Sequence, residues 1–363
     1  MKKTLLLSAL LCYAGIGASM QARDDRDKPF ISYRFPAQSI SSVQAVTSGG
    51  FLQVSGDASD EATVEVFIPP NHRKKRSNDE IRKILDEHYT LEVTEKNGQL
   101  SAVAKRKGTK WSSNTDLTIS FKIRVRSKTD TQLETSGGAI TLDNLNGKHN
   151  FKTSGGSLNI DKLTGTITGR TSGGRINVRN SRDNIDLQTS GGNIVADECR
   201  GNISLATSGG SLNLSNLNGS IVATTSGGSI VMHRLNGEID ATTSGGSISA
   251  DNIAGTLNTG TSGGSVKINN ASGNVEASTS GGTMQVQMKS VENYVRLRGN
   301  GHTHLSLPER QGYRLDIKAK KIQTGRAITN FFGSFESDRI DGTIRGGGAE
   351  VQISASRITL DFD

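Results

Sequence analysis

The chain has 363 residues, a formal net charge of +8, 43 glycines and an aromatic content of only 4%. So many glycines with so few aromatic residues exclude an ordinary aromatic-rich globular core and indicate a thin aliphatic core with many tight turns. Residues 135–296 carry 12 basic and 11 acidic residues, so the basic excess is spread over the two flanks. That distribution argues against a nucleic-acid-binding surface.

Residues 1–22 have the pattern of a secretory signal peptide. Lys2 and Lys3 precede an apolar run from Leu5 to about Ile16, and small residues follow, with cleavage expected after Ser19 or Ala22. The run is shorter than the roughly 20 residues of a membrane-spanning helix, and no other uncharged stretch approaches that length. We therefore predict a protein without a membrane span, exported to the periplasm, the cell surface or the medium.

Residues 23–134 are predicted to form a first coil, irregular strands and one short helix that together act as an N-terminal cap or insertion. The segment "SVQAVTSGGFLQVSG" alternates apolar and polar residues on both sides of a Gly pair, which indicates the first coil. Ser77 and Glu80 have the spacing of a capping box at the start of the helix. Asn97 and Gly98 predict a hairpin turn. Such elements would cover the open edge of a stacked sheet.

A four-residue motif, "TSGG", dominates the middle of the chain. Counting its Thr as position 0, apolar residues recur at positions 5 and 7 and again at positions 14 and 16, and a spacing of two is the alternation of a β-strand. Each glycine would cost about 1 kcal/mol inside a helix, which excludes a helical repeat. The motif recurs every 18 residues without insertion, at Thr135, Thr153, Thr171, Thr189, Thr207, Thr225, Thr243, Thr261 and Thr279.

This repeat predicts an all-β fold, a single-stranded parallel β-solenoid with one 18-residue coil per repeat and "TSGG" at each corner. We expect nine regular coils over residues 135–296, and irregular C-terminal coils with a cap near "TNFFGSFE" over residues 297–363. Equivalent residues of successive coils would stack about 4.8 Å apart. The glycine pairs are expected to supply turns with positive φ. Cys199 occupies a position where other coils carry Leu, so we expect it to be buried.

The serial units "TSGGSLNL…LNGSIVATTSGGSI", the strand "LTISFKIRV" and the closing "GTIRGGGAEVQIS" resemble the bacterial putative-adhesin family of β-strand-repeat proteins, a domain of unknown function. The resemblance covers roughly residues 38–363. It implies an exported β-solenoid of the cell envelope with an adhesive or structural role. It supplies no catalytic residues.

Two acidic residues are the best candidates for an enzymatic alternative. Parallel β-helices can carry polysaccharide lyases and hydrolases, and a glycosidase needs two carboxyl groups about 5–10 Å apart. Asp143 and Asp161 occupy the same position in adjacent repeats and could stack near that distance. Nothing else in the sequence marks them as catalytic, so we predict a protein that is not an enzyme. His302 and His304 share a strand face without a third ligand, and we predict no metal site and no cofactor.

The clearest local anomaly is a concentration of basic residues in neighbouring repeats. Stacked like charges repel each other unless acidic residues or an anionic ligand neutralise them. Compensation by nearby acidic residues is the favoured interpretation, and an anionic-glycan or lipopolysaccharide patch is the alternative. The acidic residues are Asp183, Asp186, Asp197 and Glu198. We therefore predict a non-catalytic, adhesin-like or structural solenoid that binds a glycan or envelope polymer through its polar faces, with an anionic polysaccharide as the expected partner. The residues of the predicted anionic-ligand patch are Lys152, Arg170, Arg175, Arg179, Arg182 and Arg200.

Overall fold

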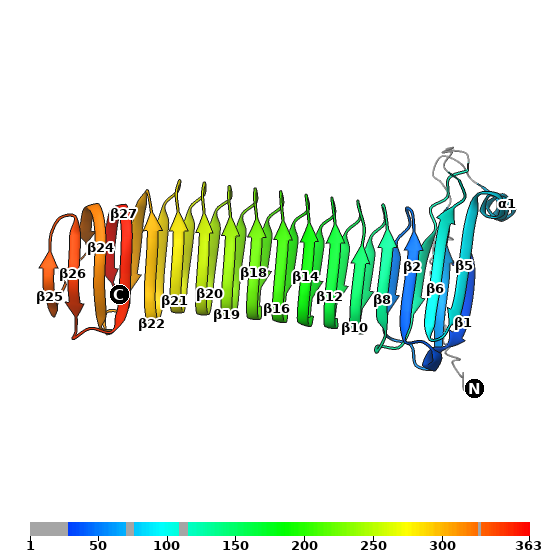
Figure 1. Cartoon of the computed structure of the whole chain (residues 1–363), viewed down its shortest axis with the longest axis horizontal. Coiled ribbons are helices and arrows are strands. Elements are labelled where there is room, and N and C mark those ends of the chain that lie inside the picture. Colours follow the sequence, from blue (N-terminus) through cyan, green and yellow to red (C-terminus); the bar gives the residue numbers. More distant parts are fainter. Residues whose placement is uncertain (1–27, 70–75, 109–114, 326–327) are drawn as a thin grey trace, which may run out of the picture.

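The computed structural model describes residues 28–69, 76–108, 115–325 and 328–363. The predicted signal peptide lies outside these residues. The described chain forms a long rod of stacked parallel coils, which is the β-solenoid predicted from the repeat (Figure 1). No helix in the described part of the chain is long and apolar enough to cross a membrane.

Each regular coil contributes a long strand and a short strand, so the rod has two parallel ladders. Equivalent residues pair one repeat apart, as Leu158 does with Ile176 and Ile176 with Ile194. The long strands are β8 (Asp130–Thr135), β10 (Asn146–Lys152), β12 (Thr164–Thr171), β14 (Arg182–Thr189), β16 (Arg200–Thr207) and β18 (Asn218–Thr225). The short strands are β9 (Ile140–Asp143), β11 (Leu158–Asp161), β13 (Ile176–Arg179), β15 (Ile194–Asp197) and β17 (Leu212–Ser215). The two runs merge into single strands in β19 (Ile230–Thr243), β20 (Ile248–Thr261) and β21 (Val266–Thr279).

The core lies between the two ladders and consists of the apolar residues that the repeat predicted. In one coil, Ile176, Val178, Ile185 and Leu187 are at most 1% exposed. Cys199 is also buried, as predicted, and its burial raises the pKa of the thiol to about 11. A buried thiol of that kind behaves as a small apolar residue.

The threonine of each "TSGG" ties one coil to the next. In a representative coil, the buried Thr207 hydroxyl donates a hydrogen bond to the carbonyl oxygen of Gly192, 2.9 Å away, and accepts one from the Gly210 N–H at 3.2 Å. The same two bonds recur at each repeat from Thr153 to Thr279. The hydroxyl therefore satisfies backbone groups of two coils at a corner where strand pairing stops.

Replacing Thr207 with valine is expected to lower the free energy of unfolding by about 1–3 kcal/mol. Valine keeps the shape of threonine but leaves the Gly192 carbonyl and the Gly210 N–H without the hydroxyl that bonds both. Urea unfolding followed by circular dichroism measures the change. Thr207→Ser keeps the hydroxyl and serves as the control, and equal losses in both variants would contradict this role for the hydrogen bonds.

The expectation that the "TSGG" glycines supply positive φ is wrong. Positive φ occurs at position 12, which is glycine in most coils, and at position 9, whose residues are Asn144, Lys162, Asn180, Glu198, Asn216, Arg234, Asn252 and Asn270. The second glycine of the motif is needed for space instead: a Cβ on Gly210 would lie 1.9 Å from the carbonyl oxygen of Gly192. The first glycine has room, because a Cβ on Gly209 would lie 3.6 Å from its nearest neighbour, the Ser190 oxygen.

The N-terminal end extends both ladders first with parallel strands and then with antiparallel ones. The strands are β1 (Ile31–Pro36), β2 (Ser42–Thr47), β3 (Leu52–Ser55), β4 (Glu61–Phe67), β5 (Tyr89–Lys96), β6 (Gln99–Arg106) and β7 (Ser120–Arg124), and a short 3-10 helix, Ala37–Ser39, follows β1. The first coil is β2 and β3, and it pairs with β8 and β9. Beyond it, β6 and β5 continue the long ladder, while β7, β4 and β1 continue the short one.

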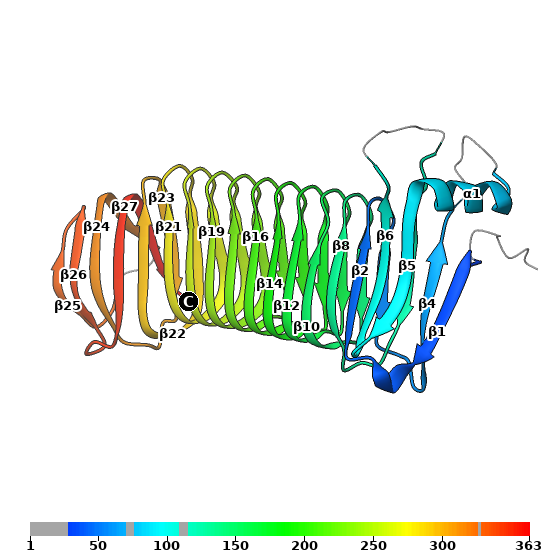
Figure 2. The ribbon, with the colours of Figure 1, turned by 45° about the vertical axis from the view of Figure 1, so that its right-hand side comes forward.

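The predicted helix and hairpin are both confirmed at this end. Helix α1 (Asn78–His88) begins with the capping box of Ser77 and Glu80 and buries Ile81 and Leu85. Figure 2 shows α1 at one end of the N-terminal strands, above β4 and β5. The hairpin between β5 and β6 turns at Asn97 and Gly98, which both have positive φ.

At the C-terminal end, strand order departs from chain order. The strands are β22 (Met284–Gly299), β23 (His302–Leu307), β24 (Tyr313–Thr324), β25 (Phe331–Phe335), β26 (Arg339–Ile344) and β27 (Ala349–Phe362). The last strand, β27, lies between β22 and β23 on one side and β24 on the other, and pairs with all three in parallel. Antiparallel β26 and β25 follow, so β25 ends the rod (Figure 1).

Candidate functional site

The structure separates the six basic residues of the predicted patch into three pairs. Lys152 and Arg170 are neighbours near the C-terminal ends of β10 and β12. The Arg170 guanidinium forms a hydrogen-bonded ion pair with the carboxylate of Asp186 in the next long strand. Lys152 stacks between Glu134 and Arg170. Acidic residues of the adjacent coils therefore compensate this pair.

The second pair, Arg175 and Arg179, belongs to the short-strand side of the rod. Both side chains are exposed. Arg179 ends β13 and stacks between Asp161 and Asp197 of the two flanking coils. Its charge is thus flanked by two carboxylates of opposite sign, which reduces its attraction for an anionic ligand.

The third pair, Arg182 and Arg200, lines a hollow on the surface of the rod. These residues begin β14 and β16 and pair directly with each other in the long ladder. The hollow, about 740 Å³ in volume, follows the bend that joins the short strands to the long strands, and we name it the edge groove. Its lining residues are Asn144, Lys162, Thr164, Asn180, Arg182, Glu198, Cys199, Arg200, Asn216 and Asn218.

The edge groove is built by the left-handed residue of each bend. Asn144, Lys162, Asn180, Glu198 and Asn216 all have φ between 50° and 56°, and this conformation turns the chain sharply between the two ladders. The long strand starts two residues later, and four of these five coils also contribute its first residue, namely Thr164, Arg182, Arg200 and Asn218. Asparagine adopts positive φ more readily than most residues, which explains its frequency at this position.

Three aspartates of the short strands beside the groove, Asp143, Asp161 and Asp197, already have partners. Lys162 Nζ lies 3.3 Å from Asp161 Oδ2 and 3.9 Å from Asp143 Oδ1. The side-chain amides of Asn180 and Asn216 donate to Asp161 at 2.7 Å and to Asp197 at 2.8 Å. These carboxylates are therefore not available to neutralise the arginines of the groove.

The two groove arginines keep most of their donors free within the described structure. Arg182 Nε donates to Thr164 Oγ1 at 3.1 Å, while no ion pair joins Arg182 or Arg200 to any described residue. Glu198 adds one negative charge to the lining, against the three positive charges of Lys162, Arg182 and Arg200. The groove therefore presents two stacked guanidinium groups and a net positive charge.

The aspartate pair considered for an enzyme has a different environment from that of a catalytic acid. Asp143 and Asp161 stack directly between β9 and β11, with Lys162 Nζ near both. Burial alone would raise the pKa of Asp161, but hydrogen bonds from Asn180 and Lys162, with the charge of Lys162, hold it below its usual value. A glycosidase acid needs a raised pKa in order to carry a proton at neutral pH. Asp161 is instead poised to remain ionised.

The two histidines contact single partners rather than a common centre. His302 Nε2 lies 2.9 Å from Thr359 Oγ1, and His304 Nε2 lies 2.7 Å from Asp361 Oδ2. Within the described ranges, no group of three or more His, Cys, Asp or Glu side chains could hold a metal ion.

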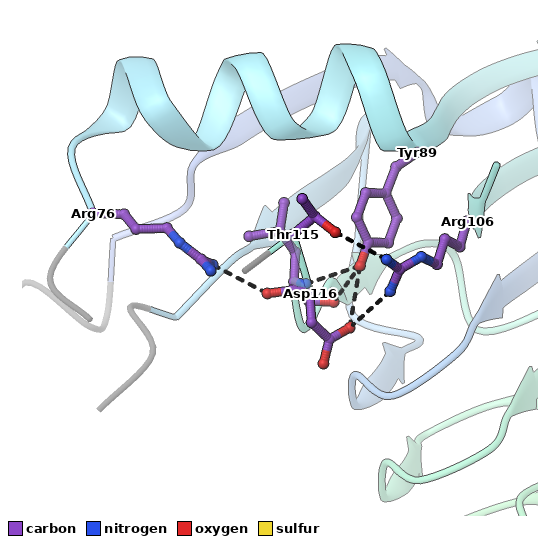
Figure 3. Close-up of polar contacts among 6 residues, drawn as sticks. Arg76, Tyr89, Arg106, Thr115 and Asp116 are labelled. Atoms are coloured by element: carbon purple, nitrogen blue, oxygen red, sulfur yellow. Dashed lines mark hydrogen bonds and ion pairs between the residues drawn. The ribbon is translucent and has the colours of Figure 1, made fainter. Parts of the chain in front are cut away.

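A polar cluster that the sequence did not indicate fastens the N-terminal end (Figure 3). The Tyr89 hydroxyl accepts a hydrogen bond from the Leu117 N–H at 2.8 Å, and Arg106 Nη2 donates to Thr115 Oγ1 at 2.9 Å. Arg76 Nη1 donates to the Asp116 carbonyl oxygen at 3.0 Å. The cluster joins the chain before α1, the start of β5 and the end of β6 to residues 115–117, which is a structural role.

No family model matches the chain, and no curated protein matches it. Among solved structures, it is similar to a putative cell adhesion protein from Clostridium sporogenes, with 12% identity, a TM-score of 0.20, and coverage of 93% of this chain and 100% of that one. It is also similar to a putative adhesin from Bacteroides fragilis, with 13% identity, a TM-score of 0.24, and coverage of 76% and 96%. Both of these solved structures are named as putative adhesion proteins.

Proposed function

We propose that this protein is an adhesin-like rod that binds a polysaccharide of the bacterial envelope or of a host surface and does not cleave it. The observation that carries the proposal is the edge groove, a hollow that runs over several coils and presents repeated hydrogen-bond donors.

Export is part of the proposal. The pattern of residues 1–22 directs the chain through the secretory pathway, to the periplasm, the cell surface or the medium, where such polymers occur. A long solenoid suits this setting, because its stacked backbone ladder holds a rigid binding surface without disulfides.

The rival function is a carbohydrate-active enzyme that uses Asp143 and Asp161. Both candidates predict contact with a polysaccharide, and they differ in whether the polymer is cut. Lys162 beside both carboxylates and the lowered pKa of Asp161 favour binding.

We expect the protein to be retarded in native gels that contain its polysaccharide, without creating new chain ends in that polymer. Gels containing single bacterial and host polysaccharides measure retention, and each polymer is then assayed for new reducing or unsaturated ends. New ends that disappear in Asp143→Asn and Asp161→Asn variants would establish the enzyme instead. Unretarded migration in every gel would contradict both functions.

A further inference from the structure

We infer that the edge groove binds an acidic polysaccharide along the rod axis, with Arg182 and Arg200 together holding one anionic substituent. The inference rests on the proposed function and adds the class of polymer, its direction and the residues that select it.

The first support is the direct stacking of the two arginines. Arg182 and Arg200 are partners in the parallel ladder, so their backbones lie about 4.8 Å apart. Stacked like charges destabilise a sheet unless an opposite charge lies between them. Asp161 and Asp197 beside the groove are bonded to Lys162, Asn180 and Asn216, and Glu198, the one acid of the lining, offsets only one of its three positive charges, so a ligand anion can neutralise the rest.

The second support is the chemistry of the donors. A guanidinium group presents a planar fork of N–H donors that fits the oxygens of a carboxylate or an oxyanion such as sulfate. Two forks one coil apart can bond different oxygens of the same substituent. Asn218 follows Arg200 in the same ladder. Its side-chain amide forms no hydrogen bond to a described residue, so it can bond a sugar hydroxyl.

The third support is the direction of the groove. Apart from Cys199, its lining comes from positions 9 and 11 of successive coils, from the coil of Asn144 to that of Asn216. With a rise of about 4.8 Å per coil, the lining extends for roughly 19 Å parallel to the axis of the rod. A linear polymer can follow such a trough, whereas a compact metabolite would use only a fraction of it.

The residue types also exclude a second class of polyanion. Proteins that hold single-stranded nucleic acids stack the bases on aromatic side chains. The lining of the edge groove contains asparagine, threonine and charged side chains and no aromatic ring. Its donors and acceptors suit the hydroxyl groups of sugars.

The test uses substitutions that the solenoid already accommodates. Three other coils carry asparagine at position 11, namely Asn146, Asn218 and Asn236. Arg182→Asn and Arg200→Asn therefore introduce a residue that the fold accepts at this position. The matched control removes the same charge at two positions of the short-strand side that do not line the groove. Arg175→Asn and Arg179→Ser copy Asn193 and Ser215 of later coils.

Binding of the full chain is measured by affinity electrophoresis with polygalacturonate, dextran sulfate and neutral dextran. The wild type is expected to bind at least one anionic polymer. Each groove variant should weaken that binding about five- to tenfold, and the double groove variant should abolish it. The double control variant should change it less than about twofold, and Glu198→Asn should strengthen it by removing the one acid of the lining.

The outcomes separate the inference from the proposed function. A preference between the two anionic polymers identifies carboxylate or sulfate as the substituent. Equal weakening by the groove and control variants would overturn the inference in favour of unspecific charge attraction. Retention by neutral dextran that the groove variants leave unchanged would overturn the inference and leave the proposed function standing. Binding to none of the polymers in any panel would end both.

Discussion

Replacing Gly210 with alanine is expected to lower the free energy of unfolding by about 3 kcal/mol. The new Cβ would lie 1.9 Å from the carbonyl oxygen of Gly192 and 2.4 Å from its carbonyl carbon. These are backbone atoms, so no side-chain rotation relieves the contact, and two coils must separate at that corner. Overpacking in a close-packed interior typically costs about 1–3 kcal/mol, and contact with rigid backbone belongs at the upper end.

Gly209→Ala is the matched control for this substitution. It adds the same methyl group at the adjacent residue, where the nearest atom is the Ser190 carbonyl oxygen at 3.6 Å. We expect it to change stability by less than about 1 kcal/mol. Urea unfolding of both variants tests the difference, and a similar loss in both would contradict the close contact between successive corners.

The second large effect is a loss of stability between about pH 6.5 and pH 4. His149 is buried in the long ladder, where its neighbour in the next coil is Ile167, and Thr131 Oγ1 lies 3.1 Å from its Nδ1. Burial lowers the pKa of His149 to about 4, against the opposing influence of Asp130. The folded protein therefore holds this imidazole neutral.

The sign of the pH dependence follows from that depressed pKa. Between about pH 6.5 and pH 4 the unfolded chain binds a proton at His149 that the folded chain does not, so stability falls as the pH falls through this window. A pKa of about 4 in the folded chain, against about 6.5 in the unfolded chain, lowers the free energy of unfolding by about 3 kcal/mol when the whole window is crossed.

Unfolding experiments at several pH values measure this loss against a His149→Ile variant. Isoleucine is the residue of the following coils, Ile167 and Ile185, so the variant should fold and should lose the contribution of this group. The difference in stability between wild type and variant is expected to change by about 3 kcal/mol across the window. A constant difference would show that His149 can accept a proton within the fold.

Much of the fold can be predicted from the sequence because every repeat carries the same strand and turn pattern. Apolar residues two apart on either side of "TSGG" define both strands, and an unbroken period of 18 allows only stacked coils. Ser77 and Glu80 predict the start of α1 correctly, since a capping box depends on local contacts alone.

Other features depend on contacts between coils that a local pattern does not contain. Glycine is required at position 210 because the backbone of the preceding coil leaves no room for a Cβ, and not because of its φ. The expectation that this glycine supplies a positive φ is therefore wrong. The position of β27 between β22 and β24 likewise arises from distant pairing.

The basic residues show the same limit at the candidate site. Their clustering in sequence was visible, but their separation depends on which side of the bend each position faces. Arg170 pairs with Asp186 and Arg179 stacks between two aspartates, whereas Arg182 and Arg200 line the edge groove. The signal that could have located the groove is the asparagine-rich position 9, which marks the bend at Asn144, Asn180 and Asn216.

The most direct test of the account compares three proteins in gels containing polygalacturonate or dextran sulfate: the wild type, the Arg182→Asn/Arg200→Asn variant and the Arg175→Asn/Arg179→Ser variant. The account predicts that the wild type and the second variant are retarded, that the groove variant migrates as in a polymer-free gel, and that the polymer gains no new ends. Equal retardation of all three proteins, or cleavage of the polymer, would contradict it.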